Sequence, residues 1–475
     1  MSLAMIRKII VPLLILFQAQ VYSNDVLLTA DEVSNSISII DENTFKLLEI
    51  IPLGPDREYA LSSSIKPGMQ TNVHGLSLSP DKKTLVVTSN ISNSVVLYDV
   101  GLMAKPIKYF NVGLSPHVSM YTPDGKEIWV ASRGTSSVDI IDVKKLQLIK
   151  KLEVSNCPSF FGFMTKKPIV FIVNTCTTNL DVVNYKTKKI IKRIPLNGIF
   201  SPLIALTPDQ KEAWVIRKDA EEVLRIDTEK MEQLESIKVG SYPQHIAFTT
   251  KNNLPIGIVT VGGENKVKFY SYTPTSKNSS LLVGEVNTPG VPHGMVMSPD
   301  GRKVYVATEF GDEVASISID KLVVNGIVKV GNSPQSLIFA KELNYVKSNE
   351  LVPRNDPANI ETIKIDLESN NPKIKGASLS IRSAPHNIYT TFVVFGNFEF
   401  KDEFNFYLSK SVKSVGDINT DDKTLIGYVF CRAGGFSCID YSSMTQDFST
   451  IEKIKNKKYK IFAVNRSKTI FLQSK

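Results

Sequence analysis

The chain has 475 residues, of which 42% are hydrophobic and 22% are charged. This composition excludes a wholly disordered protein, and the length allows more than one ordinary domain. The formal net charge is +9, and part of it is local, because the segment 452–475 carries eight basic residues against one acid, Glu452. We expect this segment to form a solvated strand face and predict no nucleic-acid partner.

The first 23 residues have the pattern of a secretory signal. Arg7 and Lys8 precede the apolar run 9–17, and residues 21–23 suit cleavage after Ser23. The run is too short to favour a membrane span, and no later segment reaches the roughly 18 uninterrupted apolar residues that a spanning helix needs. We therefore predict a signal peptide over 1–23 and an exported chain, either periplasmic or secreted to the cell surface. An uncleaved signal anchor is the alternative.

A repeat of about 42 residues begins near residue 26. The copy from Val291 to Ser318 contains Pro-His, a short apolar run, Ser-Pro-Asp-Gly, the run Val-Tyr-Val-Ala, a polar turn and a second alternating run. The residues that open the seven copies, called the opening residues below, are His74, His117, Ser159, Pro202, Gln244, His293 and Gln335. Their successive spacings are 43, 42, 43, 42, 49 and 42 residues. Such a period, built of about four short strands, predicts a β-propeller with one blade per repeat.

The two ends of the repeat array complement each other. The segment from Leu27 to Gly54 matches the second to fourth strands of a blade, and the segment from Val330 matches a first strand without successors. We therefore predict an all-β, seven-bladed propeller over 24–342, closed by strand exchange between its N- and C-terminal ends. After a linker over 343–358, alternating apolar segments predict a small all-β domain over 359–475.

Several short motifs recur in the repeats. They are VVTSN at Val86, IWVAS at Ile128, FIVNT at Phe171, VYVAT at Val304, the Ile-Asp pairs at Ile40, Ile141 and Ile226, and the Val-Gly-x-x-Pro segments at Val112, Val239 and Val330. Through these motifs the region of about 26–340 resembles the YVTN family of seven-bladed propellers. The resemblance implies the fold more than the function, because the family includes surface-layer, periplasmic and binding proteins, and similar propellers host lactonases and quinoprotein subunits.

The four cysteines form two candidate pairs, Cys157 with Cys176 and Cys431 with Cys438. An even number of cysteines in an exported chain predicts two disulfides. The sequence lacks a CxxCH motif, which excludes covalently attached haem. It also lacks a nucleophile elbow, a P-loop and a dinucleotide fingerprint, so no motif specifies an enzyme.

The opening residues should form a ring at one mouth of the channel, because the first strand of each blade lines the channel. His293, Gln335, His74 and His117 are consecutive around this circle, and His245 lies one position beyond the opening residue of its copy. Neutral imidazoles there could bind a transition metal or a haem derivative, with His74, His117 and His293 as ligands. Alternatively, each histidine bonds the backbone of the next blade. A one-residue change of strand phase would turn the ring away from the channel.

Other residues are expected at the same mouth. The long segment 55–72 leads into the His74 strand and offers Arg57 and Tyr59 as contacts. Arg133 and Arg217, in turns after second strands, suit a carboxylate or phosphate ligand, unless they are merely solvated.

From these features we predict a non-enzymatic binding protein that holds a protein or a small molecule at the mouth. Two alternatives stay open. The first is a protein that handles a metal or haem derivative, or a lactonase-like enzyme. The second is a structural or adhesion protein of the cell surface.

Overall fold

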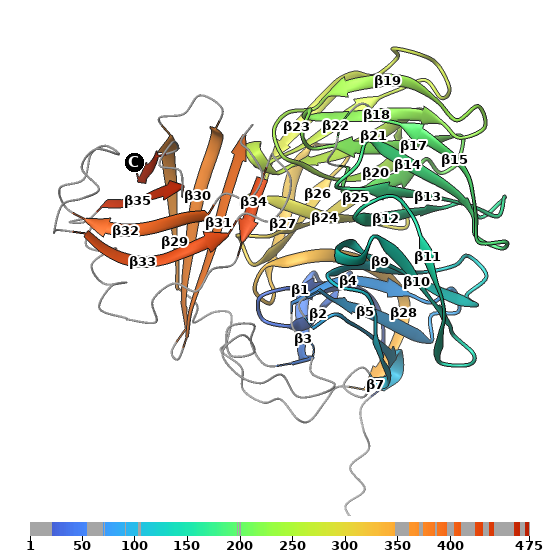
Figure 1. The fold of residues 1–475 in the computed structure, drawn as a ribbon, viewed down its shortest axis with the longest axis horizontal. Coiled ribbons are helices and arrows are strands. Elements are labelled where there is room, and N and C mark those ends of the chain that lie inside the picture. The colour runs from blue at the N-terminus through green and yellow to red at the C-terminus, as the bar shows by residue number, and fades with distance from the viewer. Residues whose placement is uncertain are drawn as a thin grey trace, which may run out of the picture.

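The computed structural model describes residues 21–54, 70, 72–90, 92–102, 106–196, 198 and 201–346 of the propeller region, and eight strands between Glu361 and Ser474. Within these ranges the chain is almost entirely β-structure (Figure 1). The three helices described are short 3-10 turns: η1 (Val100–Leu102), η2 (Arg133–Thr135) and η3 (Gly262–Glu264). None of the helices in the described part of the chain is long and apolar enough to cross a membrane.

Seven four-stranded antiparallel sheets form the propeller, which confirms the predicted seven blades. Blade 1 contains β4 (Val73–Leu78), β5 (Thr84–Ser89), β6 (Ser94–Asp99) and β7 (Pro106–Asn111). Blade 2 contains β8 (Pro116–Tyr121), β9 (Glu127–Ser132), β10 (Ser137–Asp142) and β11 (Gln147–Glu153). Blade 3 contains β12 (Pro158–Phe163), β13 (Ile169–Asn174), β14 (Asn179–Asn184) and β15 (Lys189–Pro195).

The remaining blades continue this order. Blade 4 contains β16 (Ile204–Leu206), β17 (Glu212–Arg217), β18 (Glu222–Asp227) and β19 (Glu232–Lys238). Blade 5 contains β20 (Pro243–Lys251), β21 (Leu254–Val261), β22 (Lys266–Ser271) and β23 (Leu281–Asn287). Blade 6 contains β24 (Pro292–Met297), β25 (Lys303–Thr308), β26 (Glu313–Ser318) and β27 (Val323–Lys329).

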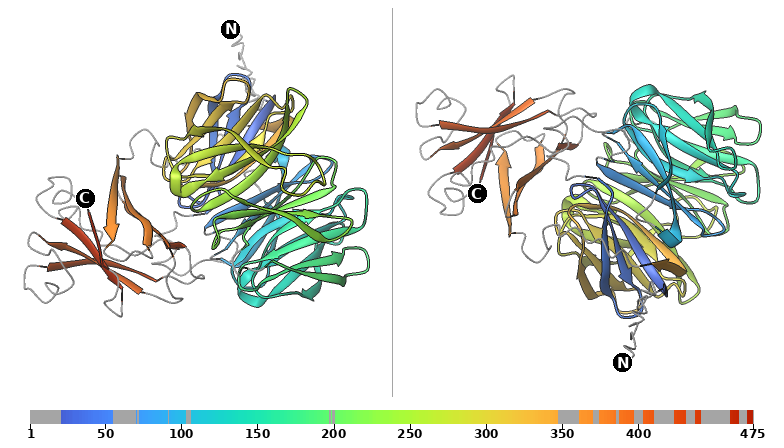
Figure 2. Two further views of the ribbon diagram at one scale, coloured as in Figure 1. Left: turned by 90° about the horizontal axis from the view of Figure 1, so that it is seen from above. Right: turned by 90° about the horizontal axis from the view of Figure 1, so that it is seen from below.

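Blade 7 is assembled from both ends of the propeller region. Its strands are β28 (Pro334–Val346), β1 (Val21–Asp31), β2 (Ser36–Asp41) and β3 (Lys46–Pro52), in that spatial order. The blue N-terminal strands lie beside orange β28 in Figure 2. Strands β1 and β28 pair antiparallel from Val21 with Val346 to Asp31 with Pro334, which confirms the predicted closure by strand exchange. Cleavage after Ser23 would leave the pairs from Asn24 onward in place.

The core lies between neighbouring blades. Trp129 and Ala131 of blade 2, for example, pack in one cluster with Phe161 and Val170 of blade 3. Second strands are therefore covered on both faces, which is why they read as continuous apolar runs. The fourth strands are the outer strands of the blades, and most of their residues are exposed to solvent, as in β11.

A β-bulge recurs where the first strand of a blade begins. In blade 2 the pairing shifts by one residue between Pro116 and Val118, so that the opening residue His117 is left out of the ladder. Corresponding shifts occur in blades 1, 3, 5, 6 and 7. A bulge turns the side chain of the unpaired residue away from the normal alternation of the strand. These bulges therefore decide in which direction the side chains of the opening residues point.

A second ring of residues lies beside the opening residues. We call them the turn residues, because each directly follows the second strand of its blade: Glu32, Asn90, Arg133, Thr175, Lys218, Gly262 and Glu309. In six blades the backbone N–H of the turn residue donates to the carbonyl of a residue just before the first strand, as in Glu32 to Ser333 at 2.9 Å and Glu309 to Val291 at 2.8 Å. These bonds hold both rings at the same face of the propeller.

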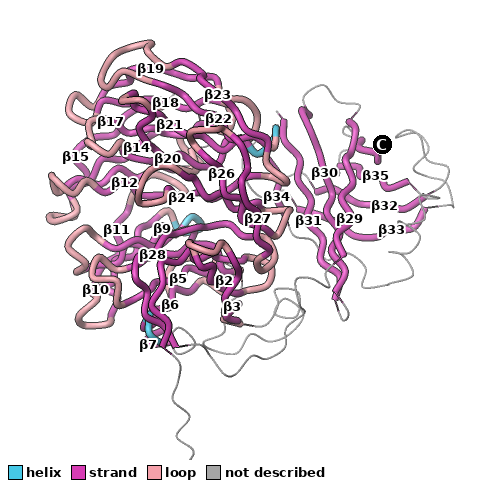
Figure 3. The backbone as a smooth tube through the Cα atoms, turned by 180° about the vertical axis from the view of Figure 1, so that it is seen from behind, coloured by secondary structure: helices cyan, strands magenta, loops and turns pink. Residues whose placement is uncertain are grey.

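The C-terminal part forms one eight-stranded antiparallel sheet, which lies next to the propeller in Figure 3. Its spatial order is β33 (Lys423–Phe430), β32 (Glu403–Ser409), β35 (Lys460–Asn465), β36 (Phe471–Ser474), β29 (Glu361–Ser369), β30 (Ile374–Ala384), β31 (Asn387–Gly396) and β34 (Ser437–Asp440). This agrees with the predicted all-β character. Strand β28 extends to Val346, and residues 347–360 lie outside the described ranges.

Candidate functional site at the propeller mouth

Two histidines from neighbouring blades meet at the mouth. The Nε2 atoms of His74 and His117 lie 2.8 Å apart. The Nδ1 atom of His117 lies 2.9 Å from the carbonyl oxygen of Ser159, the opening residue of the next blade. Three consecutive blades are therefore linked through two imidazole rings. For His117 this agrees with the alternative in which a histidine bonds the backbone of the neighbouring blade.

The hydrogen bonds fix where the protons lie. His117 Nδ1 must carry a proton, because a carbonyl oxygen can only accept. In the neutral His117 ring, Nε2 then carries a lone pair and accepts a hydrogen bond, so His74 Nε2 is the donor. The other nitrogen of His74, Nδ1, lies 3.4 Å from Glu32 Oε1. Glu32 itself accepts hydrogen bonds from the side chains of Asn72 and Asn90.

On the other side of the mouth, aromatic rings continue this series. The ring centroids of His74 and His293 are 6.2 Å apart, those of His293 and His245 are 5.1 Å apart, and those of His245 and Phe160 are 6.3 Å apart. All five rings, including that of His117, are partly buried rather than fully enclosed. The structure thus brings the four predicted histidines together, with Phe160 as a fifth ring.

His293 and His245 keep nitrogens available to a ligand. Nδ1 of His293 lies 2.9 Å from the carbonyl oxygen of Gln335 and must donate to it, so its Nε2 carries the lone pair. That Nε2, and both ring nitrogens of His245, have no hydrogen-bond partner within the described part of the chain. The Gln335 side chain is buried and donates to Ser333 Oγ at 3.2 Å.

Desolvation keeps these imidazoles neutral. The pKa of His245 is lowered to about 3, mainly by burial, with Lys218 and His74 acting in the same direction. Burial also lowers the pKa of His117 well below its usual value, with Arg133 and His74 acting in the same direction. For His293 burial is again the largest cause, followed by His245 and Lys218. Imidazoles that stay neutral at physiological pH can accept and donate hydrogen bonds without adding charge to the mouth.

Four of the turn residues bring charge to this face. Glu32 and Glu309 belong to the adjacent blades 7 and 6, whereas Arg133 and Lys218 belong to blades 2 and 4. Glu32, Lys218 and Glu309 expose 4%, 8% and 0% of their surface. Such burial is costly for charged groups unless other charges or ligands compensate it. The mouth therefore has an acidic side and a basic side.

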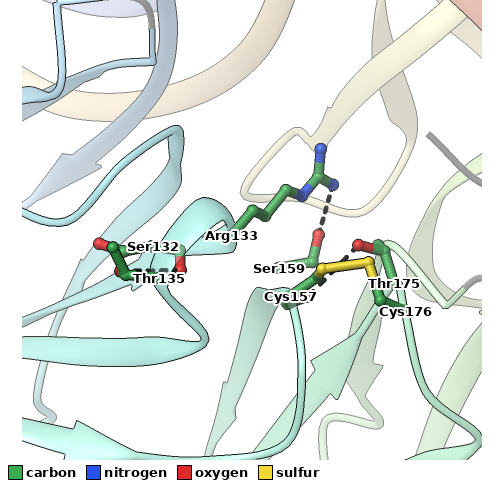
Figure 4. Close-up of a disulfide and its surroundings, with 7 residues drawn as sticks. All are labelled: Ser132, Arg133, Thr135, Cys157, Ser159, Thr175 and Cys176. Carbon is green, nitrogen blue, oxygen red and sulfur yellow. Dashed lines mark hydrogen bonds between the residues drawn. A yellow bond between two sulfur atoms is a disulfide. The ribbon is translucent and has the colours of Figure 1, made fainter. Parts of the chain in front are cut away.

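Arg133 lies next to Ser159 and the disulfide of blade 3 (Figure 4). Its Nη2 donates to Ser159 Oγ at 2.6 Å, and Ser159 Oγ in turn donates to the carbonyl of Pro202 at 2.8 Å. Within the described ranges, Ser159 is the one hydrogen-bond partner of this guanidinium, and its buried Nε has none. Burial lowers the pKa of Arg133 to about 9, and nearby Glu32 opposes this shift. Arg133 thus remains a cation at neutral pH, and some of its guanidinium N–H groups are available to bind a ligand.

The disulfide between Cys157 and Cys176 confirms one predicted pair. It connects the residue before β12 to the turn after β13, and Thr175 also donates to the Cys157 carbonyl. The disulfide therefore restrains the segment that carries Ser159. The second predicted pair stays untested, because Cys431 lies outside the described residues.

The predicted contact Arg217 bonds residues outside the histidine cluster. Arg217 is the last residue of β17, and its guanidinium bonds Glu222 and the carbonyl of Leu196. The predicted contacts Arg57 and Tyr59 lie outside the described residues. Within the described ranges, no three His, Cys, Asp or Glu side chains are arranged to hold a metal ion. A metal site on His74, His117 and His293 stays a prediction.

Several mouth residues were missed from sequence. Lys218, Glu32 and Glu309 directly follow second strands, at the same repeat position as Arg133. Comparing this position across the copies would have found them. Phe160 follows the opening residue Ser159, as His245 follows Gln244, and this offset was also a usable signal.

No protein-family model matches the chain, and the comparison with curated proteins gives no match. Solved structures are similar in fold. The Pseudomonas aeruginosa periplasmic gluconolactonase PpgL is 15% identical with a TM-score of 0.55, covering 68% of this chain and 100% of that one. Dihydro-heme d1 dehydrogenase NirN, solved in complex with DHE, is 14% identical with a TM-score of 0.51, covering 78% and 70%. Kuenenia stuttgartiensis hydrazine synthase is 17% identical with a TM-score of 0.50, covering 59% and 96%. These likenesses support the propeller fold.

Proposed function

We propose that the propeller mouth binds a small organic anion whose carboxylate pairs with Arg133. The observation that carries this proposal is the Arg133 guanidinium, which bonds Ser159 within the described ranges and lies at a mouth lined by neutral imidazoles. A planar guanidinium is suited to bind a carboxylate through two parallel hydrogen bonds. Neutral His293 and His245 can then bind hydroxyl or carbonyl groups of the same molecule.

The burial of the mouth favours a small molecule over a protein partner. The charged side chains of Glu32, Lys218 and Glu309 expose at most 8% of their surface. A flat protein surface reaches such groups poorly, whereas a small ligand can be enclosed among a few convergent polar groups.

The class of protein, its export and its domain bounds are part of the same proposal. We infer that it is an exported, non-enzymatic binding protein of the YVTN type, with a signal peptide over 1–23, a propeller over 24–342, a linker over 343–358 and a C-terminal β-domain over 359–475. Support comes from the repeat motifs, the disulfide and the periplasmic neighbour PpgL.

The test uses the full mature chain and calorimetric titration with sodium salts of acetate, lactate, gluconate and benzoate. We expect at least one of them to bind, and Arg133→Gln to weaken that binding about 10- to 100-fold, since a charge-assisted hydrogen bond contributes about 1.5–3 kcal/mol. Arg302→Gln, a change at an exposed arginine in the turn before β25, is the matched control. No binding by any of the four, or equal binding by Arg133→Gln, would overturn the proposal.

A second candidate function is favoured by His293. Its tautomer is fixed by the Gln335 carbonyl, which leaves Nε2 as a lone pair suited to ligate a metal or a haem derivative. The likeness to NirN in complex with DHE points the same way, and the likeness to PpgL supports a lactonase-like enzyme instead. Titration with haem should shift its absorption spectrum in the wild-type chain and in His117→Ala, but not in His293→Ala. An unchanged spectrum in the wild type would remove the haem candidate.

A further inference from the structure

The aromatic rings at the mouth form a closed series around the channel. We call it the aromatic collar, and its members are the side chains of His74, His117, Phe160, His245 and His293. The ring centroids of His74 and His117 are 4.4 Å apart, and the three other printed neighbours in the series are 5.1 to 6.3 Å apart. The series closes at Ser159, because its carbonyl accepts the hydrogen bond from His117 and Phe160 follows it in the chain. Such centroid distances are those of aromatic rings in contact.

Phe160 carries the collar past blade 4, whose opening residue, Pro202, has no aromatic ring. The Phe160 ring packs against the core between blades 2 and 3, the core between blades 3 and 4, and the core between blades 4 and 5. Only a side chain near the propeller axis can reach three successive cores, because the blades converge there. From this position the ring of blade 3 reaches His245 of blade 5. Phe160 is therefore an apolar ring at the axis, in contact with the polar histidines of the mouth.

Hydrogen bonds hold the collar in place before any ligand binds. His117 and His293 each donate from Nδ1 to a backbone carbonyl of the neighbouring blade, and His74 donates from Nε2 to His117. All five rings are only partly buried, so each keeps some surface that a ligand can cover. Rings with fixed orientations lose little conformational entropy on binding. The collar is thus a preformed aromatic surface at the mouth.

We propose that the ligand of the mouth is an aromatic carboxylic acid, whose ring packs on Phe160 and His245 while its carboxylate pairs with Arg133. Printed contacts place this cation beside the collar. Arg133 Nη2 donates to Ser159 Oγ at 2.6 Å, the same oxygen lies 3.2 Å from Nδ1 of His117, and Phe160 is the next residue. In an acid such as benzoate the carboxylate is attached directly to the ring, so one small planar molecule offers a group to each. This inference rests on the proposed function, because Arg133 binds the carboxylate in both.

The test compares two acids that differ in aromaticity. Benzoate and cyclohexanecarboxylate have the same carbon skeleton and one carboxylate each, but only benzoate has a planar π-system. In calorimetric titrations of the full mature chain we expect benzoate to bind about tenfold more tightly. Phe160→Leu keeps an apolar side chain without the ring, and should bring the ratio of the two dissociation constants close to one. His245→Leu should also lower this ratio, and it provides the test if Phe160→Leu does not fold. Tyr109→Leu, at an exposed ring of the outer strand β7, is the control and should keep the ratio.

The outcomes separate this inference from the proposed function. If the wild type binds both acids equally and both bind more weakly to Arg133→Gln, the aromatic ligand is overturned and the anion site stands. A preference for benzoate that persists in Phe160→Leu and in His245→Leu would also overturn the role of the collar. If benzoate binds the wild type and Arg133→Gln with equal affinity, the pairing with Arg133 is wrong and both proposals fall. Both also fall if neither of these two acids nor acetate, lactate or gluconate binds.

Discussion

The Nε2 atoms of His74 and His117 lie 2.8 Å apart, although 43 residues separate them in the chain. Together with the bond from His117 Nδ1 to the Ser159 carbonyl, this contact joins the opening residues of three consecutive blades. Glu32 of blade 7 lies at one end of this series, 3.4 Å from His74 Nδ1. The mouth is thus held by side chains that cross from blade to blade, in addition to the backbone ladders within each blade.

This linkage predicts different costs for two changes at His117. Leucine in place of His117 leaves the Ser159 carbonyl and His74 Nε2 without their partners, and should cost about 2–3 kcal/mol of unfolding free energy. Asparagine can still donate from its amide at the position of Nδ1, so His117→Asn should be about 1 kcal/mol more stable than His117→Leu. Urea unfolding at pH 7.5 measures both. Equal stability of the two variants would show that the bond to Ser159 contributes nothing.

The neutral imidazoles predict that the propeller loses stability in mild acid. The pKa values of His117, His245 and His293 are lower in the folded chain than the usual 6.5. Below pH 6.5 the unfolded chain therefore binds more protons, so this stability is fully present above pH 6.5 and decreases as the pH falls. Each histidine should contribute a loss of about 1.4 kcal/mol per pH unit. Urea titrations between pH 7 and 5.5 should show a flatter slope in His245→Gln, and an unchanged slope would contradict the assignment.

Asp31 predicts the opposite pH dependence. Burial raises its pKa to about 7, against the lowering effect of hydrogen bonds donated by Ser38, Thr29 and Ser36. The folded chain binds the proton more tightly, so this contribution to stability is present below about pH 4 and is lost as the pH rises to 7. Relative to Asp31→Asn, the wild type should lose about 1.4 kcal/mol per pH unit in this window and remain constant above it. Parallel stability curves for the two proteins would refute the prediction.

The disulfide between Cys157 and Cys176 should stabilise the folded chain substantially. The two cysteines are 19 residues apart, and closing a loop of this length restricts the unfolded chain by roughly 3 kcal/mol. Cys157→Ser with Cys176→Ser should lower the free energy of unfolding by about that amount. Adding a reductant to the wild type should have a similar effect. If the double variant unfolds at the same urea concentration as the oxidised wild type, the staple has no stabilising role.

Replacing Arg225 should lower the free energy of unfolding far more than replacing an exposed arginine. Its side chain is fully buried, and it bonds Glu212 at 2.8 Å and Glu235 at 2.6 Å, as well as the carbonyl of Thr273 between β22 and β23. Arg225→Met would leave two carboxylates without their cation and should cost about 3–5 kcal/mol. Arg302→Met, at an exposed turn, should cost less than about 0.5 kcal/mol. Thermal unfolding of the three proteins measures the difference, and similar midpoints would contradict it.

The blades could be predicted because each repeat contains its own strand and turn signals. The Ser-Pro-Asp turns, the apolar second strands and the incomplete repeats at the two ends were sufficient for seven blades and for the closure of β1 on β28. The candidate site was only partly predicted. Its histidines follow from their repeat position. The sequence patterns point to Arg217 and not to Lys218, because one residue decides whether a side chain precedes or follows the turn.

The sequence by itself determined the number of blades, their order and the ring of opening residues, because strand periodicity and turn chemistry are local and repeat every 42 to 49 residues. Only the tertiary structure decided which side chains meet. The bulges at the opening residues change the direction of the imidazole side chains. Closure of the propeller ring brings Glu32 to His74, and it makes the blade of Glu309 the neighbour of the blade of Glu32. Side-chain direction at a bulge depends on the neighbouring strand and on the next blade, which no local pattern encodes.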